Sequence, residues 1–166
     1  MLAIRTGLQW AVILAVAWAA MGLFLPGGFL IGAAQWLVFT RRLRGSAWWI
    51  PAYGAAWVAA LWLSMRGTMQ IMPDFLTFGL VGGGAAGFMQ WRTLRTHAKK
   101  AWRWIPVSVV AACAGCWAGE FAGFSLVVDY SVDDRWAWAG GGAVGGIIFG
   151  FISGAVFAKL VRPATT

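Results

Sequence analysis

Two cysteines three residues apart, Cys113 and Cys116, have the CxxC spacing that supports thiol–disulfide exchange in redox proteins. Both lie in the middle of an apolar, glycine-rich stretch, where a thiolate is disfavoured and a thiol packs as a small hydrophobic group. Two thiols also lack the additional histidine or carboxylate ligands that a tetrahedral zinc site needs. We therefore expect neither redox chemistry nor a metal ion at this motif.

One carboxylate, Glu120, lies between Gly119 and Phe121 in the same apolar stretch. Ionisable side chains at membrane depth are costly and usually functional, so this residue is a candidate proton or cation site. The alternative is that the side chain reaches the outer surface or bonds to a neighbouring helix. The sequence leaves both interpretations open.

Two glutamines in apolar segments, Gln35 and Gln90, are each followed by a tryptophan, Trp36 and Trp91. Together with three further tryptophans they could form a polar and aromatic shelf that contacts lipids or ring pigments such as carotenoids, quinones or chlorins. These three are Trp10, Trp49 and Trp104. One alternative is hydrogen bonding between helices, at under about 2 kcal/mol for each bond. Another is an aromatic belt that anchors helix ends at the bilayer interface.

Other catalytic groups are scarce. The single histidine, His97, lies in a basic segment, so haem ligation by two histidines is excluded. The chain has no nucleotide-binding loop, no Ser–His–Asp order and no pair of neighbouring carboxylates that would suit acid–base catalysis. We predict that the protein is not an enzyme and has no intrinsic cofactor.

The elements that position these residues are expected to be membrane helices. Of the 166 residues, 61% are hydrophobic and 11% are charged, whereas a soluble domain has roughly 25% charged residues. The mean hydropathy is +0.74. A chain this poor in charge cannot cover a hydrophobic core with a polar surface, so we expect its solvent to be lipid. Its basic residues form short clusters between apolar segments, which argues against nucleic acid as a partner.

Six apolar segments follow one another along the chain: 6–25, 26–40, 47–64, 73–91, 104–128 and 136–161. The second has only about 14 apolar residues, or roughly 21 Å of helix, against a hydrocarbon core of about 30 Å. If all six cross the bilayer, 11 of the 13 Lys and Arg residues lie on one side and the acidic residues lie on the other. The positive-inside rule then places both termini in the cytoplasm. We predict an all-α integral protein with six transmembrane helices in the bacterial inner membrane.

An internal repeat supports the same number of segments. A shift of 55 residues gives nine identities, among them Gly28 with Gly83, Gly32 with Gly87, Gln35 with Gln90 and Trp49 with Trp104. In a fainter third copy, Trp10 takes the place of Trp49, and Gly142 and Gly146 take the places of Gly28 and Gly32. We predict one transmembrane domain, 1–166, built from three successive αα-hairpins, 5–44, 46–100 and 101–166.

Glycines recur every four residues in three of the segments. The series are Gly79, Gly83 and Gly87; Gly115, Gly119 and Gly123; and Gly142, Gly146, Gly150 and Gly154. Each series predicts a flat groove in which two helix backbones approach closely. The partner is either another helix of this chain or, most readily at the last segment, a helix of another subunit.

The order of a glycine-spaced helix ending in Gln-Trp, an arginine cluster and a Trp-rich helix resembles that of a group of small multi-pass bacterial membrane proteins. The closing stretch is similar to their glycine-rich last helix and reads AGGGAVGGIIFGFISGAVFAKLVRP. This resemblance implies the fold and transfers no functional residue. We predict a non-catalytic subunit that packs against other subunits and lipids of an energy-transducing, photosynthetic complex. The alternative is a small channel or transporter that uses Glu120.

Overall fold

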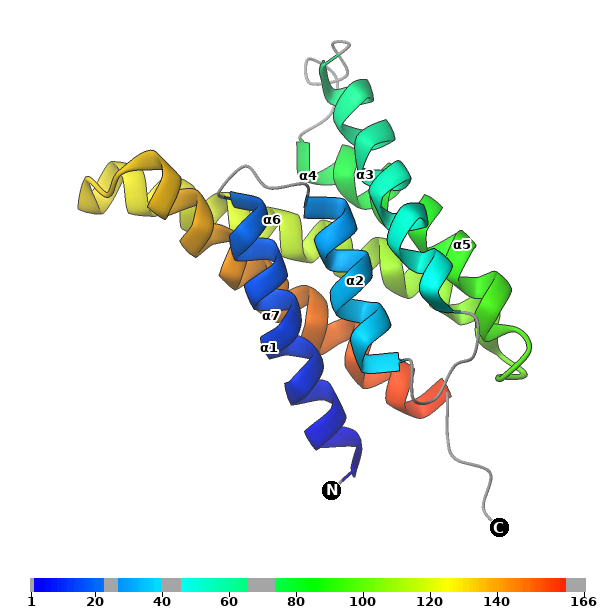
Figure 1. Cartoon of the computed structure of the whole chain (residues 1–166). Coiled ribbons are helices and arrows are strands. Elements are labelled where there is room, and N and C mark those ends of the chain that lie inside the picture. Colours follow the sequence, from blue (N-terminus) through cyan, green and yellow to red (C-terminus); the bar gives the residue numbers. More distant parts are fainter. Residues whose placement is uncertain (1, 23–26, 40–45, 66–73, 161–166) are drawn as a thin grey trace.

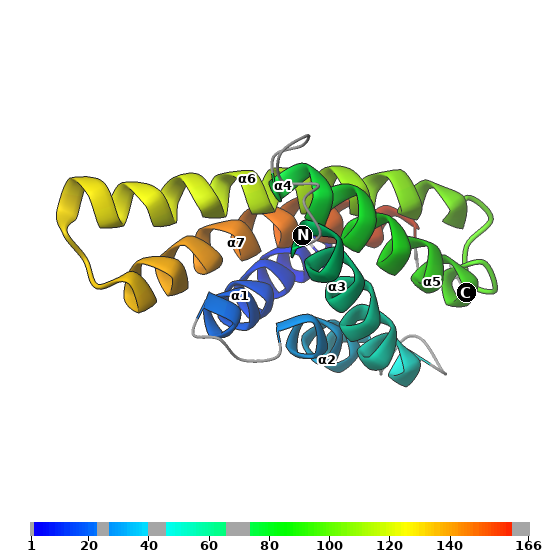
Figure 2. The same ribbon diagram turned by 90° about the horizontal axis from the view of Figure 1, so that it is seen from above.

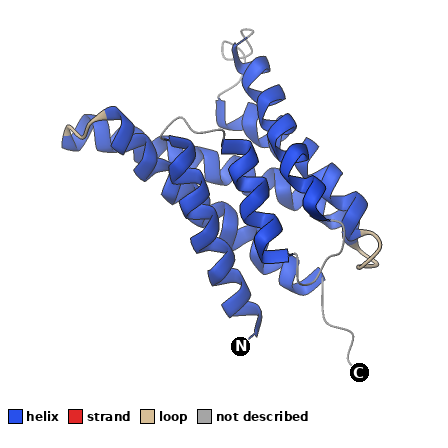
Figure 3. Ribbon diagram, in the orientation of Figure 1, coloured by secondary structure: helices blue, strands red, loops and turns tan. Residues whose placement is uncertain are grey.

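The computed structural model describes residues 2–22, 27–39, 46–65 and 74–160, all within or between helices, and these residues include no β-strand (Figure 3). The all-helical class predicted from the sequence is confirmed for this part of the chain. The six apolar segments correspond to six helical rods in chain order. The fourth rod consists of two α-helices joined by a π-helical segment.

The helices are labelled in Figure 1. They are α1 (Leu2–Gly22), α2 (Gly27–Phe39), α3 (Trp49–Met65), α4 (Asp74–Thr77), α5 (Gly84–Leu94), α6 (Trp104–Tyr130) and α7 (Asp134–Leu160). A π-helical segment, Phe78–Gly83, joins α4 to α5 in one rod. Short 3₁₀ turns, Ser46–Trp48 and Ala101–Arg103, lead into α3 and α6. The same kind of turn therefore precedes both Trp-rich helices.

Local sequence explains where these helices begin and end. Pro51 and Pro106 are the third residues of α3 and α6, where a backbone N–H has no partner within the helix to lose. Ser131 ends α6 in the left-handed conformation, with φ of 52°. The Asp133 carboxylate then accepts a hydrogen bond of 3.1 Å from the backbone N–H of Arg135 and caps the start of α7.

The helices form a closed series of neighbours. Each rod packs against the next along the chain, and α7 returns to pack along α1, the most extensive helix pair in the molecule (Figures 1 and 2). The core between them is made of large aromatic side chains and a few polar ones. Its wholly buried aromatic members are Trp10, Trp49, Tyr53, Trp104, Phe149 and Phe157.

Two stretches of the described chain are long and apolar enough to cross a membrane, Ala101–Tyr130 and Asp134–Leu160. At 1.5 Å per residue, the 27 residues of α7 span about 40 Å. Shorter apolar helical stretches occur at Leu8–Ala20, Gly28–Leu37 and Trp49–Leu63. The 13 residues of α2 agree with the short second segment expected from the sequence.

Candidate functional site

The two glutamines that the repeat aligns, Gln35 and Gln90, are hydrogen-bonded to each other. The side-chain amide of Gln90 donates to the Gln35 Oε1 atom. The indole N–H of Trp104 donates to Gln90 Oε1 over 2.7 Å, and Gln35 Nε2 donates to the Tyr53 hydroxyl over 3.3 Å. All four side chains are buried. A single polar cluster thus links α2, α3, α5 and α6 inside the bundle.

Two more tryptophans of the predicted shelf, Trp10 and Trp49, also point inward. Trp10 donates its indole N–H to Ser153 Oγ over 2.7 Å, and Trp49 donates to Thr93 Oγ1 over 3.3 Å. Trp10, Trp49 and Trp104 are all 0% exposed. Helix packing encloses these three, with Gln35 and Gln90, which favours the alternative of hydrogen bonding between helices over contact with lipid or pigment. Trp36 and Trp91 are half-buried.

The hairpins α2–α3 and α5–α6 pack with the same register. A Cβ atom placed on Gly28 would lie 2.9 Å from the Tyr53 carbonyl oxygen and 2.8 Å from the Cβ of Trp57. A Cβ atom on Gly83 would lie 2.8 Å from the carbonyl oxygen of Ser108 and 2.8 Å from the Cβ of Ala112. Every partner is displaced by the same 55 residues that relate the glycines.

The contact between α7 and α1 has the same pattern. A Cβ atom on Gly146 would lie 2.5 Å from the carbonyl oxygen of Leu14, and one on Gly150 would lie 2.6 Å from the Cα of Ala11. Ser153 then occupies the place of Gln35 and Gln90, and accepts a bond from a tryptophan as Gln90 does. In these contacts Gly146 and Gly150 correspond to Gly28 and Gly32. This match lies one helical turn later along α7 than the match of Gly142 and Gly146 expected from the sequence. The glycine contacts pair α2 with α3 and the rod containing α5 with α6, so that each glycine helix packs on the Trp-rich helix that follows it. The division into the hairpins 5–44, 46–100 and 101–166 stays a prediction.

The three glycine series all lie against helices of the same chain. Gly79, Gly83 and Gly87 face α6; Gly115, Gly119 and Gly123 face α7; and Gly142, Gly146, Gly150 and Gly154 face α1. The α7 groove is therefore filled by α1, which supports the first of the two predicted partners, another helix of this chain.

The CxxC motif belongs to this packing. Cys113 is the nearest neighbour of Gly79, and Cys116 is buried in the core of the bundle. Both thiols are free. They pack as small apolar groups between helices, which agrees with the expectation from the sequence. His97 lies outside this packing, at the exposed turn after α5, where its Nδ1 atom lies 2.8 Å from Thr96 Oγ1.

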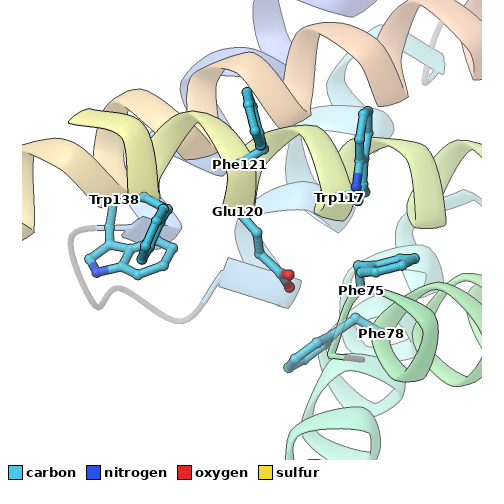
Figure 4. A pocket seen from close by; sticks show the side chains of 7 residues that line it. Phe75, Phe78, Trp117, Glu120, Phe121 and Trp138 are labelled. Atoms are coloured by element: carbon cyan, nitrogen blue, oxygen red, sulfur yellow. The ribbon is translucent and has the colours of Figure 1, made fainter. Parts of the chain in front are cut away.

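Glu120 lies in an open groove of about 580 Å³ between the fourth rod and the α6–α7 hairpin (Figure 4). We call this the Glu120 groove. Its other lining residues are all aromatic: Phe75, Phe78, Trp117, Phe121, Phe124 and Trp138. Figure 4 shows the carboxylate extending toward the space between Trp138 on one side and Phe75 and Phe78 on the other. The sequence drew attention to Glu120 but did not predict this aromatic lining, which comes from four elements: α4, the π-helical segment, α6 and α7.

Three buried polar atoms have no hydrogen-bond partner among the described residues: the indole nitrogens of Trp18 and Trp57 and the hydroxyl of Ser108. Sequence reasoning missed all three. The rings of Trp18 and Trp57 meet edge to face, with centroids 5.6 Å apart. Each follows a hydrogen-bonded tryptophan, Trp10 or Trp49, by two helical turns, so the register of the hairpins places them together.

The fold and these contacts define a glycine-packed, all-helical bundle with an internal polar cluster and one aromatic groove. No protein-family model, no curated protein and no solved structure matches the chain. Within the described residues there is no group of three metal-ligating side chains. The buried polar cluster of Gln35, Gln90, Tyr53 and Trp104 and the Glu120 groove are therefore the features that bear on function.

Proposed function

We propose that the chain is a non-catalytic, multi-pass subunit that braces a larger assembly in the bacterial inner membrane. The observation that carries this proposal is that the two buried glutamines bond to each other and to neighbouring aromatic side chains. Gln35, Gln90 and Trp104 are wholly buried and use their hydrogen-bonding groups across helix contacts. Groups arranged in this way hold helices in register, whereas a conduit would present them to a water-filled path.

The outer surface supports a membrane location. Leu8, Val12 and Val16 occur one turn apart on α1, and each is more than half exposed. Such a stripe of large apolar side chains is costly in water and natural in lipid. The distribution of charge also supports this location. The turn between α5 and α6 carries Lys99 and Lys100, whereas Asp133 precedes α7 and Asp134 begins it. We propose that all six rods cross the bilayer, with the basic turn and both termini in the cytoplasm.

We further propose that the chain contains three copies of one unit, a glycine helix followed by a Trp-rich helix. The matching contacts of Gly28, Gly83 and Gly146 support this arrangement. The third copy is split, since its glycine helix is α7 at one end of the chain and its Trp-rich helix is α1 at the other. Packing of α7 on α1 then completes the ring of helices.

The subunit role is tested by purification from the native membrane in a gentle detergent, with mass spectrometry and an absorption spectrum of the same fraction. We expect stoichiometric membrane partners, and pigment bands if the host is photosynthetic. A photocrosslinker placed at Val16 on the outer face of α1 should capture a partner, while the same group at the buried Leu14 should not. A chain that elutes alone and crosslinks only to lipid would contradict the role.

A second candidate function is a small transporter, which the Glu120 groove favours because it holds a carboxylate about 15 Å from the end of α6. Flux of a cation into proteoliposomes would measure it. We expect Glu120→Gln to abolish the flux and Asp133→Asn, at the exposed turn, to leave it intact. Flux that is unchanged by Glu120→Gln would remove this residue from the mechanism.

A further inference from the structure

We propose that the Glu120 groove binds a lipophilic organic cation, a molecule with apolar rings or chains around one positive charge. This site is not part of the subunit role, because a brace needs no ligand. Its size suits such a molecule. The volume of about 580 Å³ lies within the range of about 300–1,000 Å³ that is usual for small-molecule sites.

The walls of the groove are suited to a cation because every lining residue other than Glu120 is aromatic. Trp117, Phe121 and Phe124 are 56%, 66% and 62% exposed along one face of α6. Trp138 of α7 closes one side, and Phe75 and Phe78 close the other. Aromatic ring faces carry negative potential and attract organic cations, most strongly where water is excluded.

Charge narrows the ligand class further. Glu120 is the one ionisable side chain among the residues that line the groove, so the site favours positive over negative ligands. A metal ion is a poorer fit, because calcium and magnesium require several oxygen ligands and the lining supplies one carboxylate. A neutral pigment would stack on the rings but would gain nothing from the carboxylate. At membrane depth the effective dielectric is low, which strengthens the attraction between Glu120 and a cation.

The groove is held in shape before any ligand arrives. Phe78 stacks on the buried Trp57 with ring centroids 5.2 Å apart, and Trp117 stacks on Phe121 at 6.2 Å. Trp138 packs against α6 so closely that a Cβ atom on Gly123 would lie 2.9 Å from its ring. Walls that are already ordered lose little conformational entropy on binding.

The test compares two probes of equal size and opposite charge, tetraphenylphosphonium and tetraphenylborate, with the full chain in lipid nanodiscs. Equilibrium dialysis against protein-free nanodiscs corrects for partition into lipid. We expect saturable binding of the phosphonium alone. Glu120→Gln and Phe121→Ala should each weaken it by about tenfold or more, a loss of about 1.4 kcal/mol. Phe151→Ala removes an equally exposed ring, 67% exposed and outside the groove, and should leave binding unchanged.

Three results would overturn the proposal: no saturable binding of the phosphonium, equal binding of the borate, or binding that survives Glu120→Gln. Trp117→Phe keeps a ring and should keep binding, so a loss of binding there together with an intact helical circular dichroism spectrum would also count against a cation held by ring faces. The outcome is independent of the subunit role. A chain that purifies alone but binds the phosphonium contradicts that role and supports this site.

Discussion

The substitution Gly146→Ala tests whether backbone contact between α7 and α1 holds the bundle together. The added Cβ atom would lie 2.5 Å from the carbonyl oxygen of Leu14 and 2.7 Å from the Cα of Ala15. Both are backbone atoms of α1 and cannot rotate away. Ordinary contact begins at 3.4 Å, so α1 must move outward by about 1 Å relative to α7.

The size of the effect follows from two opposing terms. Moving the two helices apart by up to about 1 Å loses as much as half of the dispersion energy between the atoms in contact. Overpacking of this kind lowers the free energy of unfolding by about 1–3 kcal/mol. Alanine offsets part of this cost, because it is favoured over glycine in helices by about 1 kcal/mol. We expect a net loss of up to about 2 kcal/mol.

The matched control is Gly84→Ala in α5, where the new Cβ atom would lie 3.6 Å from Val109 Cγ2, an ordinary contact. This variant should gain up to about 1 kcal/mol from helix propensity alone. Reversible unfolding in mixed micelles, followed by tryptophan fluorescence and circular dichroism, measures both. If Gly146→Ala is as stable as Gly84→Ala, the close approach of α7 and α1 is not what stabilises this pair.

Three further predictions concern the polar cluster and the topology. Gln35→Leu and Gln90→Leu should be non-additive by about 1 kcal/mol in a double-mutant cycle, since either change alone leaves a buried amide without its partner; additive effects would contradict the bond. Thr93→Val removes the acceptor of two indole hydrogen bonds and should cost about 1 kcal/mol, whereas Thr93→Ser should not; equal losses would show that the hydroxyl is irrelevant. In a background without native cysteines, Lys99→Cys and Asp133→Cys should be labelled by an impermeant maleimide from opposite faces of the membrane, and labelling from one face would refute the orientation.

Hydropathy predicted the helices of this chain well because each apolar run became one helical rod. The 55-residue repeat also predicted that Gln35 and Gln90 occupy equivalent places. It did not predict that they would bond to each other. That contact arises because the first hairpin packs on the second through α3, which lies against the π-helical segment and α5, and only the three-dimensional arrangement reveals this.

Burial of the tryptophans was beyond the reach of the sequence. Trp48 and Trp49 are adjacent and lie beside the same basic cluster, yet Trp48 is 37% exposed and Trp49 is 0% exposed. Neighbouring helical positions differ by about 100° in direction, so one side chain faces outward while the next faces the core. Composition cannot distinguish them, because an indole suits both an interface belt and a buried hydrogen bond.

The register of the proposed third copy is ambiguous in the sequence because its defining residue differs. Ser153 stands where the other copies have glutamine, and its short side chain accepts from Trp10 while its hydroxyl donates 2.6 Å to the Phe149 carbonyl oxygen. Because α7 has no Gln-Trp pair to mark the register, its glycines, which recur every four residues, can be matched with Gly28 and Gly32 in more than one way. The match by Gly142 and Gly146 fits the sequence as well as the match by Gly146 and Gly150 that the contacts show.

This difference between serine and glutamine divides the bundle into two parts that are held in different ways. The long side chains of Gln35 and Gln90 reach across and bond one hairpin to the other. Ser153 is too short to reach so far and bonds to Trp10 within its own helix pair, so α7 is held on α1 by that bond and by the close glycine contacts at Gly146 and Gly150. Changes at Gln90 should therefore loosen the α2–α3 and α5–α6 hairpins, and changes at Gly146 should loosen α7 from α1. Because the two sites share no partner, the stability losses of Gln90→Leu and Gly146→Ala should add to within about 0.5 kcal/mol.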